Sequence, residues 1–253
     1  MKIVIISKKD ATERRVHIAE HMRSSKHEWH FVDAAEGEPI AELPLHPDAR
    51  RLKGRDVPRG GIGCFQSHWL LWREFAKSDD DWLCVLEDDV LLDLSFDLDL
   101  LIKTLEDAGA HYIRLHFLYL RPYEKLGRFG RRTIIRFKSS PLGTQAYLIS
   151  RTAASRLAQS ITEIRTSIDD EMDKFWVHGL PVLALFPFPA LELGVPSTIV
   201  TKPFQRDPRN LRDVAYRQST KLLENARRLS SNFELRRFDD HCRRTFSQQA
   251  VRL

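Results

Sequence analysis

Short apolar runs of strand length alternate with amphipathic stretches of helix length through the first two hundred residues of this 253-residue chain. Residues 2–7 and 82–86 are examples of the runs, which fit buried strands. Between them, residues 62–76 place apolar side chains along one stripe of a helix. Strands that alternate with helices favour parallel pairing, because a parallel connection needs a crossover. The pattern therefore predicts an α/β/α sandwich with a largely parallel sheet.

The composition agrees with a folded domain, because 42% of the residues are hydrophobic and 30% are charged. The longest apolar stretch, residues 180–195, contains three prolines and Glu192, so no membrane span is expected. The apolar run near the N-terminus is too short for a secretory signal. Three widely spaced cysteines, Cys64, Cys84 and Cys242, are typical of reduced thiols. These features together predict a cytoplasmic protein.

The net charge of +5 is unevenly distributed along the chain. Residues 201–253 contain thirteen Lys or Arg against six Asp or Glu, so the remainder is slightly acidic. We therefore expect a main domain over residues 1–200 and a basic helical extension over residues 201–253. Such an extension suits nucleic acid, an anionic membrane surface or an acidic substrate, and the alternative is a solvated helical face.

Glu87, Asp88 and Asp89 follow an apolar run and form the most informative segment of the sequence. Three adjacent carboxylates repel one another and lose hydration on burial, so the segment fits either a bound cation or an exposed acidic turn. Alternation along a strand predicts that Glu87 and Asp89 point to one side and Asp88 to the other. Carboxylate oxygens at the carboxyl end of a strand suit Mg²⁺ or Mn²⁺.

Five segments carry a family resemblance when they are taken in chain order. They are Arg14-Arg15, Val32-Asp33-Ala34 with Gly37, GIGCFQSH at 61–68, LEDD at 86–89, and GTQAYLIS at 143–150 with Ile168-Asp169-Asp170 beyond it. The ordered set resembles glycosyltransferase family 25, which includes lipopolysaccharide and lipooligosaccharide galactosyltransferases. The resemblance covers about residues 1–190 and leaves the basic extension outside.

The resemblance implies a GT-A-like nucleotide-sugar-binding fold in which the acidic segment plays the role of a DxD motif. Glu87 and Asp89 are then expected to hold Mn²⁺ or Mg²⁺ on the diphosphate. The sequence departs from a strict DxD by placing Glu first, which leaves the metal preference and the contact to ribose less defined. The same resemblance assigns these residues to the nucleotide-sugar site: Ser7, Arg14, Arg15, Asp33, Ala34, Asp88, Gly143 and Thr144.

Several of these residues also have a purely structural interpretation. One of the two arginines can belong to a solvated helical face and pair with Glu13 or Glu20. Asp33 is equally compatible with a simple turn, and Gly143 with Thr144 is compatible with a turn before a strand.

Three residues are candidates for the chemistry of transfer. Asp169 matches the family and is the expected general base for the acceptor hydroxyl, with Asp170 as the alternate; the competing interpretation is a helix cap. His68 is expected to hydrogen-bond substrate or the acidic segment, and the alternative is a satisfied core histidine.

The resemblance therefore implies a metal-dependent hexosyltransferase that moves galactose from UDP-galactose, with inversion, to a lipopolysaccharide-type core oligosaccharide. A lipid-linked acceptor would place the protein at the inner face of the cytoplasmic membrane, where residues 221–229 combine leucines with Lys221, Arg227 and Arg228. The alternatives are packing of that stripe on the main domain, an inactive scaffold, or a nucleic-acid-binding protein. The slightly acidic main domain and the absence of zinc-finger or RNP motifs argue against nucleic acid.

Overall fold

The computed structural model describes residues 1–38, 40–53, 56–194 and 210–250. Its strands are β1 (Lys2–Ser7), β2 (Trp29–Asp33), β3 (Trp82–Glu87), β4 (Val90–Leu92), β5 (Tyr112–Arg114), β6 (Tyr123–Phe129), β7 (Arg132–Phe137), β8 (Ala146–Ser150), β9 (Leu183–Phe186) and β10 (Ala190–Glu192). Its helices are α1 (Thr12–Met22), α2 (Ala49–Lys53), α3 (Arg59–Phe75), α4 (Leu98–Asp107), α5 (Arg151–Ser160), α6 (Ile168–Met172), α7 (Phe175–His178), α8 (Leu211–Glu234) and α9 (Arg236–Ala250).

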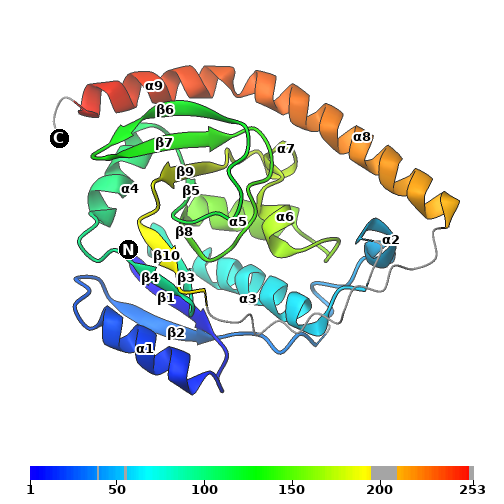
Figure 1. Cartoon of the computed structure of the whole chain (residues 1–253), viewed down its shortest axis with the longest axis horizontal. Coiled ribbons are helices and arrows are strands. Elements are labelled where there is room, and N and C mark those ends of the chain that lie inside the picture. Colours follow the sequence, from blue (N-terminus) through cyan, green and yellow to red (C-terminus); the bar gives the residue numbers. More distant parts are fainter. Residues whose placement is uncertain (39, 54–55, 195–209, 251–253) are drawn as a thin grey trace.

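A central sheet of eight strands runs in the order β2-β1-β3-β8-β5-β9-β7-β6, and β4 pairs with β10 in a small second sheet (Figure 1). The α/β class and the helical extension expected from the sequence are confirmed. The expectation of a largely parallel sheet is wrong. Strands β1, β2 and β3 pair in parallel, as do β5 and β9, whereas β8 runs antiparallel to both of its neighbours and β7 to both of its own.

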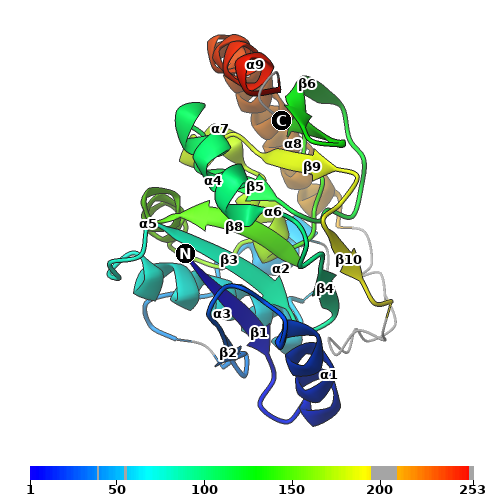
Figure 2. The same ribbon diagram turned by 90° about the vertical axis from the view of Figure 1, so that its left-hand side faces the viewer.

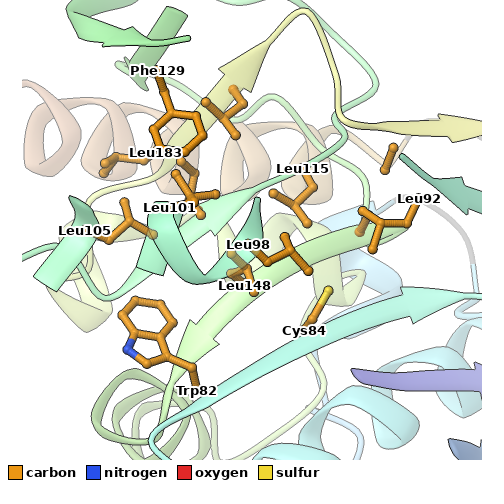
Figure 3. Packing of buried hydrophobic residues seen from close by; sticks show 14 of the residues in the cluster. Trp82, Cys84, Leu92, Leu98, Leu101, Leu105, Leu115, Phe129, Leu148 and Leu183 are labelled. Carbon is orange, nitrogen blue, oxygen red and sulfur yellow. The ribbon is translucent and has the colours of Figure 1, made fainter. Parts of the chain in front are cut away.

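Two apolar layers, one on each face of the sheet, form the core. Ile3 and Ile5 of β1 face the layer that includes α1, α4 and α9, whereas Val4 and Ile6 face the layer with α3, α5 and α6. This division follows from the alternation of side chains along a strand. Figure 3 shows part of the first layer, including Trp82, Cys84, Leu98, Leu101, Leu105 and Leu148.

The C-terminal helices form an arc that reaches from α2 to the edge strand β6 (Figures 1 and 2). Arg51 of α2 donates to Asp213 of α8 at 2.7 Å, and Tyr216 donates to Asp48 at 3.0 Å. At the other end, Cys242 and Phe246 of α9 are fully buried in the core. The boundary expected near residue 200 lies outside the described residues, but α9 is packed as part of the main domain.

A buried ion pair fixes α9 to the sheet. Arg136 of β7 donates to both carboxylate oxygens of Asp239, at 2.6 and 2.8 Å. The side chains are 1% and 3% exposed, and Arg136 also donates to Asn232 of α8 at 2.8 Å. Two parallel hydrogen bonds from one guanidinium give this contact a defined geometry.

We expect Asp239→Asn to lower the free energy of unfolding by about 3–5 kcal/mol, because it leaves the buried Arg136 charge uncompensated. Urea denaturation followed by circular dichroism measures this. Asp240→Asn is the matched control: its side chain is 61% exposed and pairs with Arg243 across the helix surface, so its effect should stay below about 1 kcal/mol. Equal stability of the two variants would contradict the proposed anchoring role.

Candidate active site

A pocket of about 400 Å³ opens where β1 and β3 end, beside the end of β2 and the first turn of α3. Ser7 pairs in register with Asp33, and Ile6 pairs with Glu87, so three strand ends meet at one edge of the sheet. The chain leaves β1 for β2 on one side and reaches β3 on the other, and ligands of open α/β sheets bind at such switch points. The polar lining residues are Ser7, Lys8, Arg14, Glu36, Arg59, Cys64, Ser67, His68, Glu87, Asp88 and Asp89.

Asp88 is the most strongly compensated acid of the segment. Its carboxylate accepts a hydrogen bond from the Ser7 hydroxyl at 2.6 Å and one from Arg14 Nη1 at 2.9 Å. The same Arg14 nitrogen lies 3.9 Å from Asp89 Oδ2. Arg14 therefore stands between two neighbouring carboxylates and offsets their repulsion.

Arg15 has a different position from Arg14. It donates to the Ser7 carbonyl at 2.8 Å and to the Asp33 carboxylate, and its guanidinium lies 5.0 Å from the centre of the Phe31 ring. Arg15 thus bridges the ends of β1 and β2 and is not among the residues that line the pocket. Ala34 does line it, and its N–H donates to the Ser7 carbonyl at 2.9 Å.

Glu87 is held by side chains from α3 and from the segment before β8. It accepts a hydrogen bond from the Thr144 hydroxyl, and its Oε1 lies 3.5 Å from Nε2 of His68. The other ring nitrogen, Nδ1, is 2.9 Å from the Tyr147 hydroxyl, which also accepts from Trp72 Nε1. Because the Glu87 carboxylate only accepts, the His68 proton is assigned to Nε2, which faces it, and the Tyr147 hydroxyl then donates to Nδ1.

Asp89 is the least compensated acid. Its Oδ1 is buried and has no hydrogen-bond partner among the described residues. Burial, and then the charges of Glu87, Asp88 and Glu192, raise the pKa of Asp89 to about 6 in spite of Arg14. For Glu87, burial raises the pKa, but the hydrogen bond and charge of His68, followed by the Thr144 hydroxyl, outweigh it and leave the pKa below its usual value.

The expected alternation of the three acids is wrong. Strand β3 ends at Glu87, and the next two residues form a turn before β4. A turn does not continue the two-residue period of a strand, so Asp88 faces the same pocket as Glu87 and Asp89. The structure therefore brings all three carboxylates to one cavity.

The segment before β8 connects the pocket to Asp169. Gly143 has φ = +96°, and a side chain there would begin 2.4 Å from Gln145 Oε1. Its N–H donates to Asp169 Oδ2 at 3.3 Å, while the adjacent Thr144 reaches Glu87. The other Asp169 oxygen accepts from the Asp170 N–H at 2.9 Å. Asp169 is therefore one peptide unit away from the Thr144–Glu87 contact, although it does not line the pocket itself.

Asp170 follows Asp169 in α6, and both residues are half-buried. Its Oδ2 accepts from the Ser167 hydroxyl at 3.0 Å, which is an interaction at the helix start. Behind Gly143, Asp173 accepts from the Leu142 N–H at 2.8 Å and from Arg114 at 2.6 Å, and this ion pair is fully buried. The buried Asp173–Arg114 pair thus fixes the loop that carries Gly143 and Thr144.

The sequence model of Glycosyltransferase family 25 (LPS biosynthesis protein) matches residues 1–172, which include every strand end that forms the pocket. The chain belongs to glycosyltransferase family 25. The α/β sheet with its C-terminal helices agrees with the GT-A-like fold that this membership implies. Strands β9 and β10 and the helices α8 and α9 lie beyond the matched residues.

Named relatives of this family 25 chain come from bacteria and from a vertebrate. The "Lipooligosaccharide biosynthesis protein lex-1" of Haemophilus influenzae is 25% identical over 193 residues, and the match covers 64% of this chain and 64% of that protein. The "Lacto-N-neotetraose biosynthesis glycosyltransferase LgtE" of Neisseria gonorrhoeae is 28% identical over 207 residues, which covers 72% and 71%. The "Procollagen galactosyltransferase 1-B" of Xenopus laevis is 28% identical over 119 residues, which covers 42% and 19%. The chain thus spans less than two thirds of the length of the first relative.

Sequence reasoning missed the contacts that build the rim of the family 25 pocket. The Ser67 hydroxyl accepts from the Ala35 N–H at 2.8 Å and donates to the Gly63 carbonyl at 2.7 Å. A side chain at Gly63 would begin 2.4 Å from the Ala35 carbonyl oxygen, so glycine lets α3 approach this segment. Arg59 donates to the Glu36 carbonyl at 2.9 Å. Between β2 and α3, the described residues include the short helix α2.

We expect Asp89→Asn to stabilise the protein at pH 7.5 by on the order of 2 kcal/mol. A carboxyl whose pKa is raised from 3.8 to about 6 binds its proton more tightly in the folded state. The stability that this proton binding adds to the folded state is therefore complete below pH 4. It is lost as the pH rises towards 6. Urea denaturation at pH 7.5 and pH 4 should show the gain only at the higher pH. Asp88→Asn is the control and should destabilise, because Asp88 is held by Ser7 and Arg14.

Proposed function

We propose that this chain transfers a hexose, galactose from UDP-galactose, to a lipopolysaccharide-type core oligosaccharide, with inversion. The observation that carries the proposal is the pocket at three converging strand ends, where Arg14 and three carboxylates meet within the family match. The names of the relatives support it, since they refer to lipooligosaccharide and lacto-N-neotetraose biosynthesis and to a galactosyltransferase.

The donor side of the pocket offers positive charge for a diphosphate. Lys8, Arg14 and Arg59 line it together with Gly60 in the first turn of α3. The N-terminus of a helix favours phosphate, because its free N–H groups and its dipole both attract an anion. Asp33, whose side chain is 56% exposed at the end of β2, is available to accept hydrogen bonds from a ribose or a base.

The carboxylates fit a divalent cation that prefers oxygen ligands. Asp89 Oδ1 is buried without a partner among the described residues, and both contacts described for Glu87 use Oε1. Glu87 and Asp89 would hold Mn²⁺ or Mg²⁺, which neutralises the charge that develops on a leaving diphosphate. The hydrogen bond from Ser7 keeps Asp88 oriented towards Arg14, which leaves Asp89 as the acid with unmet interactions.

Asp169 is the proposed general base. In an inverting transfer, the acceptor oxygen forms a bond to the anomeric carbon while the bond from that carbon to the diphosphate breaks. The acceptor proton must pass to a base, and Asp169 receives it in this proposal. The N–H groups of Gly143 and Asp170 hold its two oxygens, so the carboxylate is oriented in advance. Asp170 remains the alternate base.

We expect UDP-galactose to raise the melting temperature only when Mn²⁺ or Mg²⁺ is present, and turnover to stop in excess EDTA. Asp89→Asn should lose at least roughly 10²-fold in turnover, in line with the loss of transition-state charge stabilisation. Screening nucleotide sugars by thermal shift, with and without Mn²⁺, measures the first effect. Full activity in EDTA would contradict metal dependence, and binding of UDP without any turnover would favour the inactive scaffold.

We expect Asp169→Asn to lower turnover by roughly 10² or more while UDP affinity stays nearly unchanged, because the residue serves the acceptor. Asn keeps an oxygen that can accept from the Gly143 N–H, so the loop geometry is retained. Asp170→Asn is the matched control at the adjacent position. A smaller loss in Asp169→Asn than in Asp170→Asn would transfer the role to Asp170, and a collapse of UDP affinity would place Asp169 on the donor side.

The outer face of α8 supports a peripheral attachment to an anionic membrane surface. Leu222, Leu229 and Phe233 are 71%, 67% and 67% exposed, so this stripe does not pack on the main domain. Exposed Lys221 and Arg227 lie on the same helix. Among the described helices, none combines the length and the apolar character that crossing a bilayer requires. Apolar residues with basic neighbours on one helix fit the interface of an anionic bilayer.

We expect the protein to co-sediment with anionic liposomes at low salt and to be released at high salt, because each basic residue near the surface contributes about 1 kcal/mol. Replacing Leu222, Leu229 and Phe233 together by Ser should abolish co-sedimentation. Val16→Ser is the control, since Val16 is a similarly exposed apolar residue on α1. Equal recovery with neutral and anionic liposomes, or no recovery with either, would overturn the membrane proposal.

A further inference from the structure

Three side chains of different chemistry converge inside the pocket. The Cys64 sulfur, a ring nitrogen of His68 and a carboxylate oxygen of Glu87 all lie within 4.8 Å of one another. Cys64 and His68 are four residues apart on α3, so they share one face of the helix. Glu87 reaches them from the end of β3. All three line the cavity, so one side of the cluster is open to a ligand.

This set of donors differs from the carboxylate pair. Mg²⁺ and Mn²⁺ prefer oxygen, whereas thiolate and imidazole select Zn²⁺ and chemically similar ions. Three protein ligands and one open position form the usual arrangement of a zinc site that still accepts a further ligand. Cys64, His68 and Glu87 would supply these three ligands as one sulfur, one nitrogen and one oxygen.

The surroundings of His68 and Glu87 also suit a metal. Histidine ligands almost always use their second nitrogen in a hydrogen bond that fixes the ring. Here Nδ1 of His68 lies 2.9 Å from the Tyr147 hydroxyl, an oxygen further fixed by Trp72 Nε1 at 2.9 Å. When Nε2 binds a cation, the imidazole proton moves to Nδ1. The Nδ1–H group then donates a hydrogen bond to the Tyr147 oxygen. The Thr144 hydroxyl orients Glu87 in the same way.

We propose that Cys64, His68 and Glu87 form a second cation site in this pocket, selective for thiophilic divalent ions such as Zn²⁺. On binding, the thiol releases its proton to solvent and the sulfur lone pair forms the bond to zinc, with no oxidation or reduction. Glu87 belongs to both sites, so zinc withdraws it from Asp89. Zinc is therefore an inhibitor that competes with Mn²⁺, a consequence that rests on the proposed function, whereas the binding itself does not.

Co²⁺ is the probe for the site, because a cobalt–thiolate bond gives a near-ultraviolet charge-transfer band that oxygen ligands do not give. We expect the whole chain to develop this band with one Co²⁺ per molecule, and Zn²⁺ to abolish it. Cys64→Ser should lose the band and weaken Zn²⁺ binding at least roughly tenfold. Asp89→Asn and Cys242→Ser are the controls and should keep it, because the first changes only the carboxylate pair and the second removes a buried thiol elsewhere.

The same variants separate this inference from the proposed function. Electron paramagnetic resonance of Mn²⁺ should show binding that is lost in Asp89→Asn and kept in Cys64→Ser, the reverse of the cobalt result. Zinc inhibition, measured relative to the Mn²⁺-supported activity of each variant, should be lost in Cys64→Ser. No cobalt band in the wild type, or an equal band in Cys64→Ser, would overturn the second site. A cobalt band without any Mn²⁺ binding would leave this site standing and overturn the metal proposal above.

Discussion

Repulsion among three adjacent carboxylates is the constraint around which the pocket is organised. The structure compensates them unequally: Asp88 receives a hydroxyl and a guanidinium, and Glu87 receives a hydroxyl and an imidazole. Asp89 keeps a buried oxygen that has no hydrogen-bond partner in the part of the chain that the structure describes. A site that satisfied all three acids equally would have no interaction left to offer a ligand. The unequal compensation therefore leaves this edge of the sheet with an interaction that a ligand can satisfy.

The position of the acids depends in turn on the strand order. Because β1 lies between β2 and β3 in parallel, the ends of all three strands meet at one edge, and α1 and α3 leave on opposite faces. Arg14 from the first turns of α1 and His68 from α3 can therefore approach the same acidic segment from two sides. The topology places the Arg14 guanidinium and the His68 imidazole, and local contacts only adjust their orientation.

The periodic parts of the fold could be predicted from the sequence, and the irregular parts could not. The apolar runs of β1 and β3 and the stripe of α3 are local patterns, so they were recognised. Strand β6 was missed because Glu124, Lys125 and Gly127 interrupt its apolar pattern, and its register with β7 shifts between Lys125 and Gly127. The reversed direction of β8 likewise depends on the whole sheet, which no local window contains.

The candidate site shows the same division. The acidic segment and Arg14 could be identified because their residue types already point to charge chemistry. Cys64 was treated only as a thiol, although its spacing to His68 on a helix was a signal that both face one side. The contact between Ser67 and Ala35 had no such signal, because it joins a helix to an irregular segment. Residue type indicates chemistry, but only the fold indicates which groups share a cavity.

The docking of α9 has a consequence for how the chain folds during synthesis. Asp239, which anchors this helix, lies 103 residues after its partner Arg136. Until α9 has been synthesised, the edge strand β6 lacks the helix that packs against it, and the core lacks Cys242 and Phe246. Open edges and incomplete cores are what chaperones recognise and what aggregation uses. The late synthesis of α9 relative to the sheet therefore prolongs the time for which the nascent chain depends on protection from aggregation.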